Sequence, residues 1–191
     1  MSNYKKIAID VGHARHTGAA GNGLQEHEVA ASLAKQVKKI LAGQWTIHAE
    51  IVDFPELSNK GDLSAAIKAI NTGNYDAVVS LHCDSSGNAS ARGAHVIYKT
   101  LAGYALAAEI ADRLAVHLPG RAEKTVQRHD LAILNQTRPP AVLVECGFVS
   151  SPVDAAILKS RPVLLASAIA AGIVQWCSPA GSKKVISHAL M

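Results

Sequence analysis

The chain contains the stretch PPAVLVECGFVSSP at residues 139–152. Its apolar run at 141–144 is typical of a buried strand, and the run ends in a carboxylate, Glu145. Strands that are buried on both faces belong to mainly parallel sheets covered by helices. Ser151 and Pro152 then give the start signal of a helix, with serine as the N-cap and proline at the first helical position. The stretch therefore predicts a strand followed by a helix, with an acid at the end of the strand.

Two other apolar strands also end in a residue capable of chemistry. The strand predicted for 5–10 leads through Gly12 to His13, and the strand predicted for 77–81 leads to His82. In open α/β sheets, ligands bind beyond the carboxyl ends of the parallel strands. If the three strands are neighbours, His13, His82 and Glu145 meet at one edge of the sheet.

Strands and helices alternate along most of the chain. Its 191 residues, 49% hydrophobic and 18% charged, suit one globular domain. The remaining strands are predicted at 45–52, 94–99 and, as a short edge strand, 129–134; the helices are predicted at 26–41, 62–71, 101–118 and 163–176. We therefore expect an α/β fold with a mainly parallel central sheet flanked by helices on both faces. This single domain is expected to span 1–176, followed by a C-terminal tail at 177–191.

Composition excludes several classes of partner. The net charge is only +4, and no cluster of lysine and arginine carries interleaved aromatic residues, so no nucleic-acid partner is expected. No stretch approaches 18 apolar residues, so no membrane span is expected. The apolar run near the N-terminus is too short for a signal peptide, which predicts synthesis in the cytoplasm. Oligomeric state is left open.

The helix predicted at 26–41 adds a fourth candidate, Glu26. At about 100° per residue, its apolar stripe is centred within about 25° of Glu26. The stripe consists of Val29, Leu33, Val37 and Ile40. On the same wheel His27 and Glu28 fall toward the opposite side. An inward glutamate at a helix start is often only a partner of the helix dipole, but two histidines nearby change that interpretation.

Two neutral imidazoles and one carboxylate form the ligand set of a catalytic zinc site, with a fourth position left for water. We therefore assign His13, Glu26 and His82 as ligands of one Zn²⁺ ion. Glu145 beside them can act as general base and then general acid. The rival interpretation of Glu145 is a structural ion pair, although its own segment contains no arginine or lysine.

Other residues are open or excluded at this stage. His16 is an alternative to His13, and the role of His95, at the start of the strand predicted for 94–99, is open. Cys83 and Cys146 follow His82 and Glu145, so in extended strands they point to the opposite face and are expected to be buried apolar residues.

With these residues in place, the chain resembles the zinc-dependent N-acetylmuramoyl-L-alanine amidases, a family of bacterial cell-wall amidases and phage endolysins. Four blocks carry the resemblance in order: IAIDVGH, TGAAGNGLQEHEVAASLA, VVSLHCDSS and LAILNQTRPPAVLVECGFVSSPVDAAIL. The resemblance implies a zinc ion held by His13, Glu26 and His82, with Glu145 as the catalytic residue. It implies a peptidoglycan substrate, cleaved at the amide between N-acetylmuramic acid and L-alanine of the stem peptide. Such a protein would reach the wall on release from the cell or through a holin.

The chain departs from the family pattern after each histidine ligand. Many relatives have Gly-Gly where this chain has Ala14-Arg15, and Ala-Asn where it has Cys83-Asp84. The roles of Arg15, His16 and Asp84 therefore stay open. Some periplasmic relatives carry an inserted helix that plugs the zinc site. Between His82 and Glu145 this chain has room only for one strand, one long helix and a connection, which predicts a domain without such an inhibitory helix. Two alternatives remain: a zinc metallopeptidase acting on the stem peptide, and a wall-binding module without catalysis.

Overall fold

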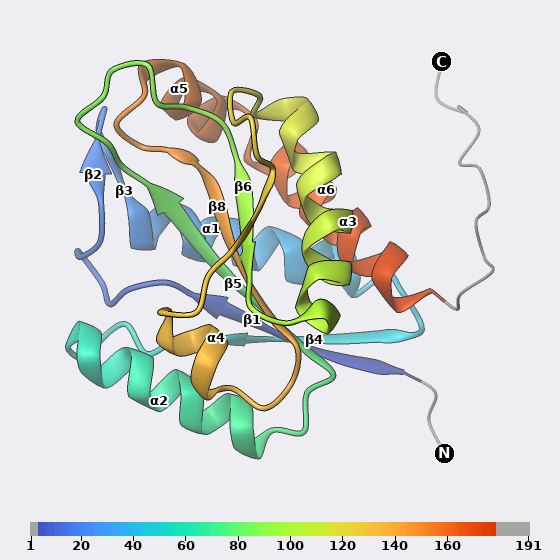
Figure 1. The fold of residues 1–191 in the computed structure, drawn as a ribbon. Coiled ribbons are helices and arrows are strands. Elements are labelled where there is room, and N and C mark those ends of the chain that lie inside the picture. Colours follow the sequence, from blue (N-terminus) through green and yellow to red (C-terminus); the bar gives the residue numbers. More distant parts are fainter. Residues whose placement is uncertain (1–3, 179–191) are drawn as a thin grey trace.

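A six-stranded sheet forms the centre of the computed structural model, which describes residues 4–178 (Figure 1). Its strands lie in the order β4-β1-β5-β8-β6-β7. In chain order they are β1 (Lys5–Val11), β4 (Ile47–Val52), β5 (Ala77–Asp84), β6 (His95–Tyr98), β7 (Thr125–Gln127) and β8 (Ala141–Phe148). The first four neighbours in the sheet run parallel, and β6 pairs antiparallel with β8 and parallel with β7. The sheet is therefore mainly parallel, as predicted.

Helices cover both faces of this sheet, and a short hairpin lies outside it. The helices are α1 (Glu26–Leu41), α2 (Asn59–Thr72), α3 (Leu101–His117), α4 (Ala132–Gln136), α5 (Pro152–Ser160) and α6 (Pro162–Cys177); the hairpin is β2 (Ala20–Gly21) with β3 (Leu24–Gln25). One core packs α1, α3 and α6 against side chains such as Ile9 and Val79. A second core packs α2 and α4 against Ala8, Val78 and Leu143. The alternation of residues along β1 and β5 between these cores confirms the predicted fold class.

The short edge strand predicted at 129–134 is wrong. Residues 132–136 form α4, and the edge of the sheet is β7 instead. Ile133 and Leu134 are both buried in the second core. A half-buried strand would point two consecutive side chains to opposite faces, whereas a helical turn can direct both toward the core.

Several element boundaries also differ from the prediction, by one to three residues. Helix α2 starts at Asn59 rather than at Asp62, because the Ser58 side chain accepts a hydrogen bond from the Gly61 N–H and caps the helix earlier. Toward the C-terminus, α6 ends at Cys177, one residue later than predicted. Residues 179–191, which make up nearly all of the predicted tail, lie outside the described residues.

Within residues 4–178, none of the helices alone has the length and apolar character to cross a membrane. The helices α5 and α6, which meet at a bend of 86°, satisfy this length and composition test only as a pair.

Asp154, in the first turn of α5, joins two strands next to the predicted site. Its carboxylate is fully buried and accepts hydrogen bonds from the Gly93 N–H at 2.6 Å and the Phe148 N–H at 3.1 Å. Phe148 ends β8, and Gly93 lies two residues before β6. The side chain therefore fixes the position of β6 relative to β8.

The Asp154→Ala variant is expected to lower the free energy of unfolding by about 3 kcal/mol, since each buried donor left unpaired costs about 1–3 kcal/mol. Urea denaturation measures this loss. The exposed Asp112, which pairs with Lys124 at 3.2 Å, is the matched control. Asp112→Ala is expected to change stability by less than about 1 kcal/mol, and an equal effect of the two variants would remove the role given to Asp154.

Candidate metal centre

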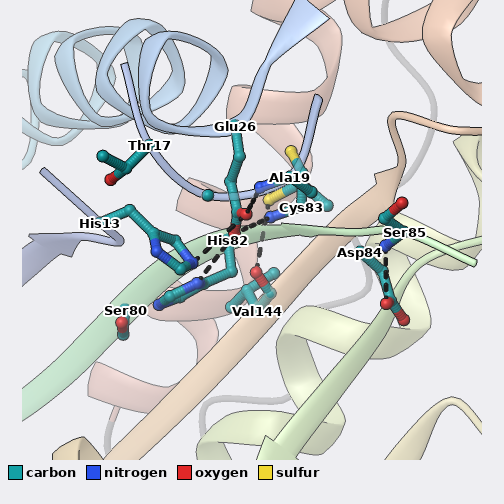
Figure 2. Close-up of polar contacts among 12 residues, drawn as sticks. His13, Thr17, Ala19, Glu26, Ser80, His82, Cys83, Asp84, Ser85 and Val144 are labelled. Carbon is teal, nitrogen blue, oxygen red and sulfur yellow. Dashed lines mark hydrogen bonds and ion pairs between the residues drawn. The ribbon is translucent and has the colours of Figure 1, made fainter. Parts of the chain in front are cut away.

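The structure brings His13, Glu26 and His82 together at the carboxyl edge of the sheet (Figure 2). His13 lies in the loop that follows β1, Glu26 is the first residue of α1, and His82 lies near the end of β5. One ligand atom from each side chain lies within 4.8 Å of the other two. The three residues that the sequence assigned to zinc therefore form one cluster, although they are far apart in the chain.

Glu26 is the centre of this cluster. Its Oε1 lies 3.0 Å from His82 Nδ1, and its Oε2 lies 3.3 Å from His13 Nε2. The same carboxylate accepts hydrogen bonds from the backbone N–H groups of Ala19 at 2.7 Å and Cys83 at 3.0 Å. These bonds tie the start of α1 to the segment before β2 and to β5, so the backbone and the two imidazoles together fix the position of the carboxylate.

The electrostatics keep Glu26 ionised. Burial by itself raises the pKa of the Glu26 carboxyl, but the hydrogen bonds to His13 and His82 outweigh it and hold this pKa well below its usual range. A carboxylate between two imidazoles is the donor set of a catalytic zinc site with three protein ligands. The chemistry of the donors and their spacing therefore fit one zinc ion.

Glycine is required at two positions beside the cluster. A Cβ on Gly12 would lie 2.3–2.5 Å from atoms of the His82 ring. Gly18 has a φ of +84°, and a Cβ there would lie 2.6 Å from Glu26 Oε2. Both glycines let the backbone approach the side chains so closely that no other residue fits without displacing a candidate ligand.

Glu145 lies next to this cluster, on the neighbouring strand. In the parallel pairing of β5 with β8, Glu145 is the register partner of His82, so both side chains emerge on the same face of the sheet. Burial raises the pKa of the Glu145 carboxyl to about 7, and the negative charges of Asp84 and Glu26 add to this effect. Within residues 4–178, Oε2 of Glu145 is buried and has no hydrogen-bond partner, and no salt bridge involves this residue. Glu145 therefore has no ion-pair partner among the described residues, which argues against the rival interpretation as a structural ion pair.

The raised pKa of Glu145 predicts how the stability of metal-free protein depends on pH. Between pH 4.5 and 7 the folded carboxyl keeps a proton that the unfolded chain has lost, so this group makes folding less favourable as pH rises. Glu145→Gln removes that penalty. The variant is expected to match the wild type near pH 4.5 and to exceed its unfolding free energy by on the order of 2 kcal/mol above pH 7.

Urea denaturation in the presence of a chelator, at several pH values across this range, measures the difference. Glu123→Gln, at an exposed position, is the control and should show no such trend. A difference for Glu145→Gln that is independent of pH would mean that the carboxyl is not held in its neutral form.

A cleft of about 250 Å³ opens beside the two histidines. Apolar side chains from α2, α4 and β8 line much of it, with Asp10 and Ser80 among its polar members. Asp10 accepts a hydrogen bond of 2.5 Å from the Ser80 hydroxyl, and burial raises its pKa to about 6. Asp10 and Ser80 are not among the residues predicted from the sequence, although an acid inside the apolar run of 7–11 is a signal that points to them.

His27 is buried although the helix wheel places it off the apolar stripe of α1. His27 is only 5% exposed, and its Nε2 lies 3.2 Å from Asp53 Oδ1. The residue lies off the apolar stripe of α1, but the segment that follows β4 covers this side of the helix and supplies the carboxylate. A wheel based on the helix alone contains no information about that segment.

The remaining candidates lie outside the cluster. His16, the alternative to His13, is largely exposed and lies 3.5 Å from Glu28. Arg15 pairs with Glu56 at 2.6 Å, and the Asp84 side chain accepts a hydrogen bond from the Ser85 N–H. Cys83 and Cys146 are free thiols, buried in the core on the opposite face from His82 and Glu145, as expected.

Comparison with known proteins assigns the chain to one protein family. Residues 7–175 match the protein family described as N-acetylmuramoyl-L-alanine amidase. The chain is 30% identical over 162 residues to the N-acetylmuramoyl-L-alanine amidase LytC of Bacillus subtilis strain 168, covering 80% of this chain and 31% of that protein. It is 28% identical over 173 residues to an endolysin of Bacillus phage SPP1, covering 84% of this chain and 60% of the endolysin. The chain thus spans less than two thirds of the length of both relatives.

Solved structures agree with these similarities. The catalytic domain of the CD27L endolysin, which targets Clostridia Difficile, superposes with a TM-score of 0.80 at 27% identity, covering 90% of this chain and 98% of that domain. The N-acetylmuramoyl-L-alanine amidase AmiC2 of Nostoc punctiforme superposes with a TM-score of 0.75 at 29% identity, covering 90% and 96% of the two chains.

Proposed function

Since the chain belongs to the N-acetylmuramoyl-L-alanine amidase family, we propose that it hydrolyses the amide between N-acetylmuramic acid and L-alanine in peptidoglycan, with zinc as its metal. The observation that carries this proposal is the cluster of His13, Glu26 and His82 at the sheet edge, with Glu145 paired beside His82. In this proposal the catalytic domain is residues 1–176.

The three clustered side chains would hold the zinc ion. When bound there, zinc supplies a Lewis acid that polarises the scissile carbonyl. The carboxylate of Glu26 offsets part of the positive charge, and its backbone hydrogen bonds to Ala19 and Cys83 keep it aimed between the two imidazoles. Such outer contacts orient the ligands of a metal site.

Glu145 would carry the proton of the reaction. Its carboxylate accepts a proton from the attacking water and then delivers it to the nitrogen of L-alanine as the C–N bond breaks. The products are the free carboxyl of the lactyl group and the free amine of the stem peptide. The burial that raises the pKa of Glu145 to about 7 suits a group that must both accept and donate a proton near neutral pH.

Digestion of purified sacculi, followed by mass spectrometry of the products, tests this function. The proposal predicts intact stem peptides with a free L-alanine amine, together with glycan strands that keep their lactyl groups. Stem peptides cut internally would instead identify a zinc metallopeptidase, and binding without any product would identify a wall-binding module. The chain is expected to act without an added activator, and activity that appears only after one is added would contradict the expectation of an uninhibited domain.

A further inference from the structure

Three titratable side chains stand in a row across the sheet. Strand β8 lies between β5 and β6, and Glu145 of β8 is paired with His82 on one side and with His95 on the other. Register partners on neighbouring strands present their side chains on the same face, with Cβ atoms about 5 Å apart in antiparallel pairs. His95 therefore flanks Glu145 on the side away from the metal cluster.

His95 is not used by the proposed function, yet it is buried. The residue is 5% exposed, and within residues 4–178 its Nδ1 has no hydrogen-bond partner. Oε2 of Glu145 is in the same condition. Buried polar atoms without partners are rare in proteins, and each one calls for an explanation. Here a nitrogen and a carboxylate oxygen, both unpartnered, belong to paired residues of adjacent strands.

The charge state of His95 suits a donor to a carboxylate. Burial, together with the positive charges of Arg121 and Arg128, lowers the pKa of His95 to about 4, so the ring is neutral at neutral pH. A neutral imidazole carries one N–H, which it can donate to an anion. The groups with the largest effects on the pKa of Glu145 are His82, Asp84, Glu26 and His13. Arg128, which follows β7 on the far side of β6, also interacts with Glu145, but His95 is the residue paired with it on that side in the sheet register.

We propose that His95 is a positioning residue, which donates a hydrogen bond from Nδ1 to the Glu145 carboxylate during turnover and so keeps that carboxylate turned toward the reacting atoms. This role rests on the proposed function of Glu145 as the proton carrier. The hydrogen bond fixes one carboxylate oxygen from the β6 side and leaves the other free to accept and deliver the proton.

The local structure holds His95 in place for this task. The antiparallel pairing of β6 with β8 aligns His95 with Glu145, Val96 with Val144 and Ile97 with Leu143. Just before the strand, the Gly93 N–H is anchored on Asp154, which also binds the Phe148 N–H three residues after Glu145. One buried carboxylate therefore ties β6 to β8 at the end of the strand pair that carries the two side chains.

The test compares variants of His95 on the sacculus assay. His95→Leu is expected to lower kcat by about ten- to a hundredfold, as is typical when an orienting partner is lost, with KM and bound zinc unchanged within about twofold. Asparagine places an amide near the position of Nδ1, so His95→Asn is expected to keep kcat within about threefold to fivefold of the wild type. The control is His48→Leu, the same change at an exposed position of the edge strand β4, which should leave kcat unaltered.

Two further measurements separate positioning from a structural role. In a Glu145→Gln background, His95→Leu is expected to cause no further loss of the residual rate, because it acts only through Glu145. In ¹⁵N NMR spectra of zinc-loaded protein, the Nδ1–H signal of His95 is expected to show a hydrogen bond that Glu145→Gln weakens.

Full kcat in His95→Leu, an asparagine variant as slow as the leucine variant, or an unchanged Nδ1–H signal in Glu145→Gln would each overturn the inference. These outcomes differ from failure of the proposed function, in which wild-type chain with bound zinc would release no stem peptide with a free L-alanine amine.

Discussion

Glu145→Gln is expected to reduce muramyl amide hydrolysis by about 10³-fold while the protein still binds one zinc ion. General acid–base groups contribute about 10²- to 10⁴-fold to rate, and Glu145 is proposed to serve as both base and acid in the same cycle. Glutamine keeps the size of the side chain and its place beside His82 on β8, but it cannot accept or release a proton at neutral pH. The measurement is the initial rate of release of stem peptide from sacculi, with zinc content determined on the same sample.

The matched control is Glu123→Gln, which makes the same change at an exposed position away from the sheet edge and should keep the wild-type rate. Glu145→Ala should be at least as slow as Glu145→Gln and should also retain zinc. If either Glu145 variant keeps zinc and more than about a tenth of the wild-type rate, far above the loss typical of an acid–base group, then another group carries the proton.

Removal of the metal is expected to abolish hydrolysis, and added zinc should restore it. Without a Lewis acid, the charge that develops on the carbonyl oxygen loses its stabilisation, and the carboxylate of Glu26 would oppose that charge. Exhaustive chelation followed by dialysis should leave a folded protein with no measurable amide hydrolysis. Back-titration with zinc should restore the rate in proportion to the zinc bound, up to one ion per chain.

The donor set also predicts which cations restore activity. Two imidazole nitrogens and one carboxylate favour zinc over Ca²⁺ and Mg²⁺, which prefer oxygen ligands. Neither of these two cations should therefore replace zinc in the chelated protein. A chelated sample that is free of metal by elemental analysis and still hydrolyses the amide at the original rate would refute a metal-dependent mechanism.

Much of the fold could be predicted because the apolar strands are short, continuous and separated by helical patterns. That pattern alone implies a parallel sheet, and the carboxyl ends of parallel strands lie at a common edge. His13, His82 and Glu145 follow three such strands, so their proximity follows from topology. Glu26 follows from helix phase, because its position on the apolar side of α1 directs it toward the sheet.

What could not be predicted depends on contacts between segments distant in sequence. The segment at 129–134 has a pattern that suits a strand, and only the packing of Ile133 and Leu134 against the second core makes part of it a helix. His27 is buried by Asp53, which comes from the segment after β4. The pairing of His95 with Glu145 requires β6 to run antiparallel beside β8, and no local feature of residues 94–99 specifies that neighbour.

The decisive measurement for the metal centre is zinc titration of the chelated protein by calorimetry, carried out on the wild type and on variants of each proposed ligand. We predict one zinc ion per wild-type chain, and an affinity at least about a hundredfold lower in His13→Ala, Glu26→Gln and His82→Ala, since each variant removes or weakens one of only three protein ligands. His16→Ala, at the exposed histidine outside the cluster, should bind zinc as the wild type does. Wild-type affinity and stoichiometry in all three ligand variants would contradict the account.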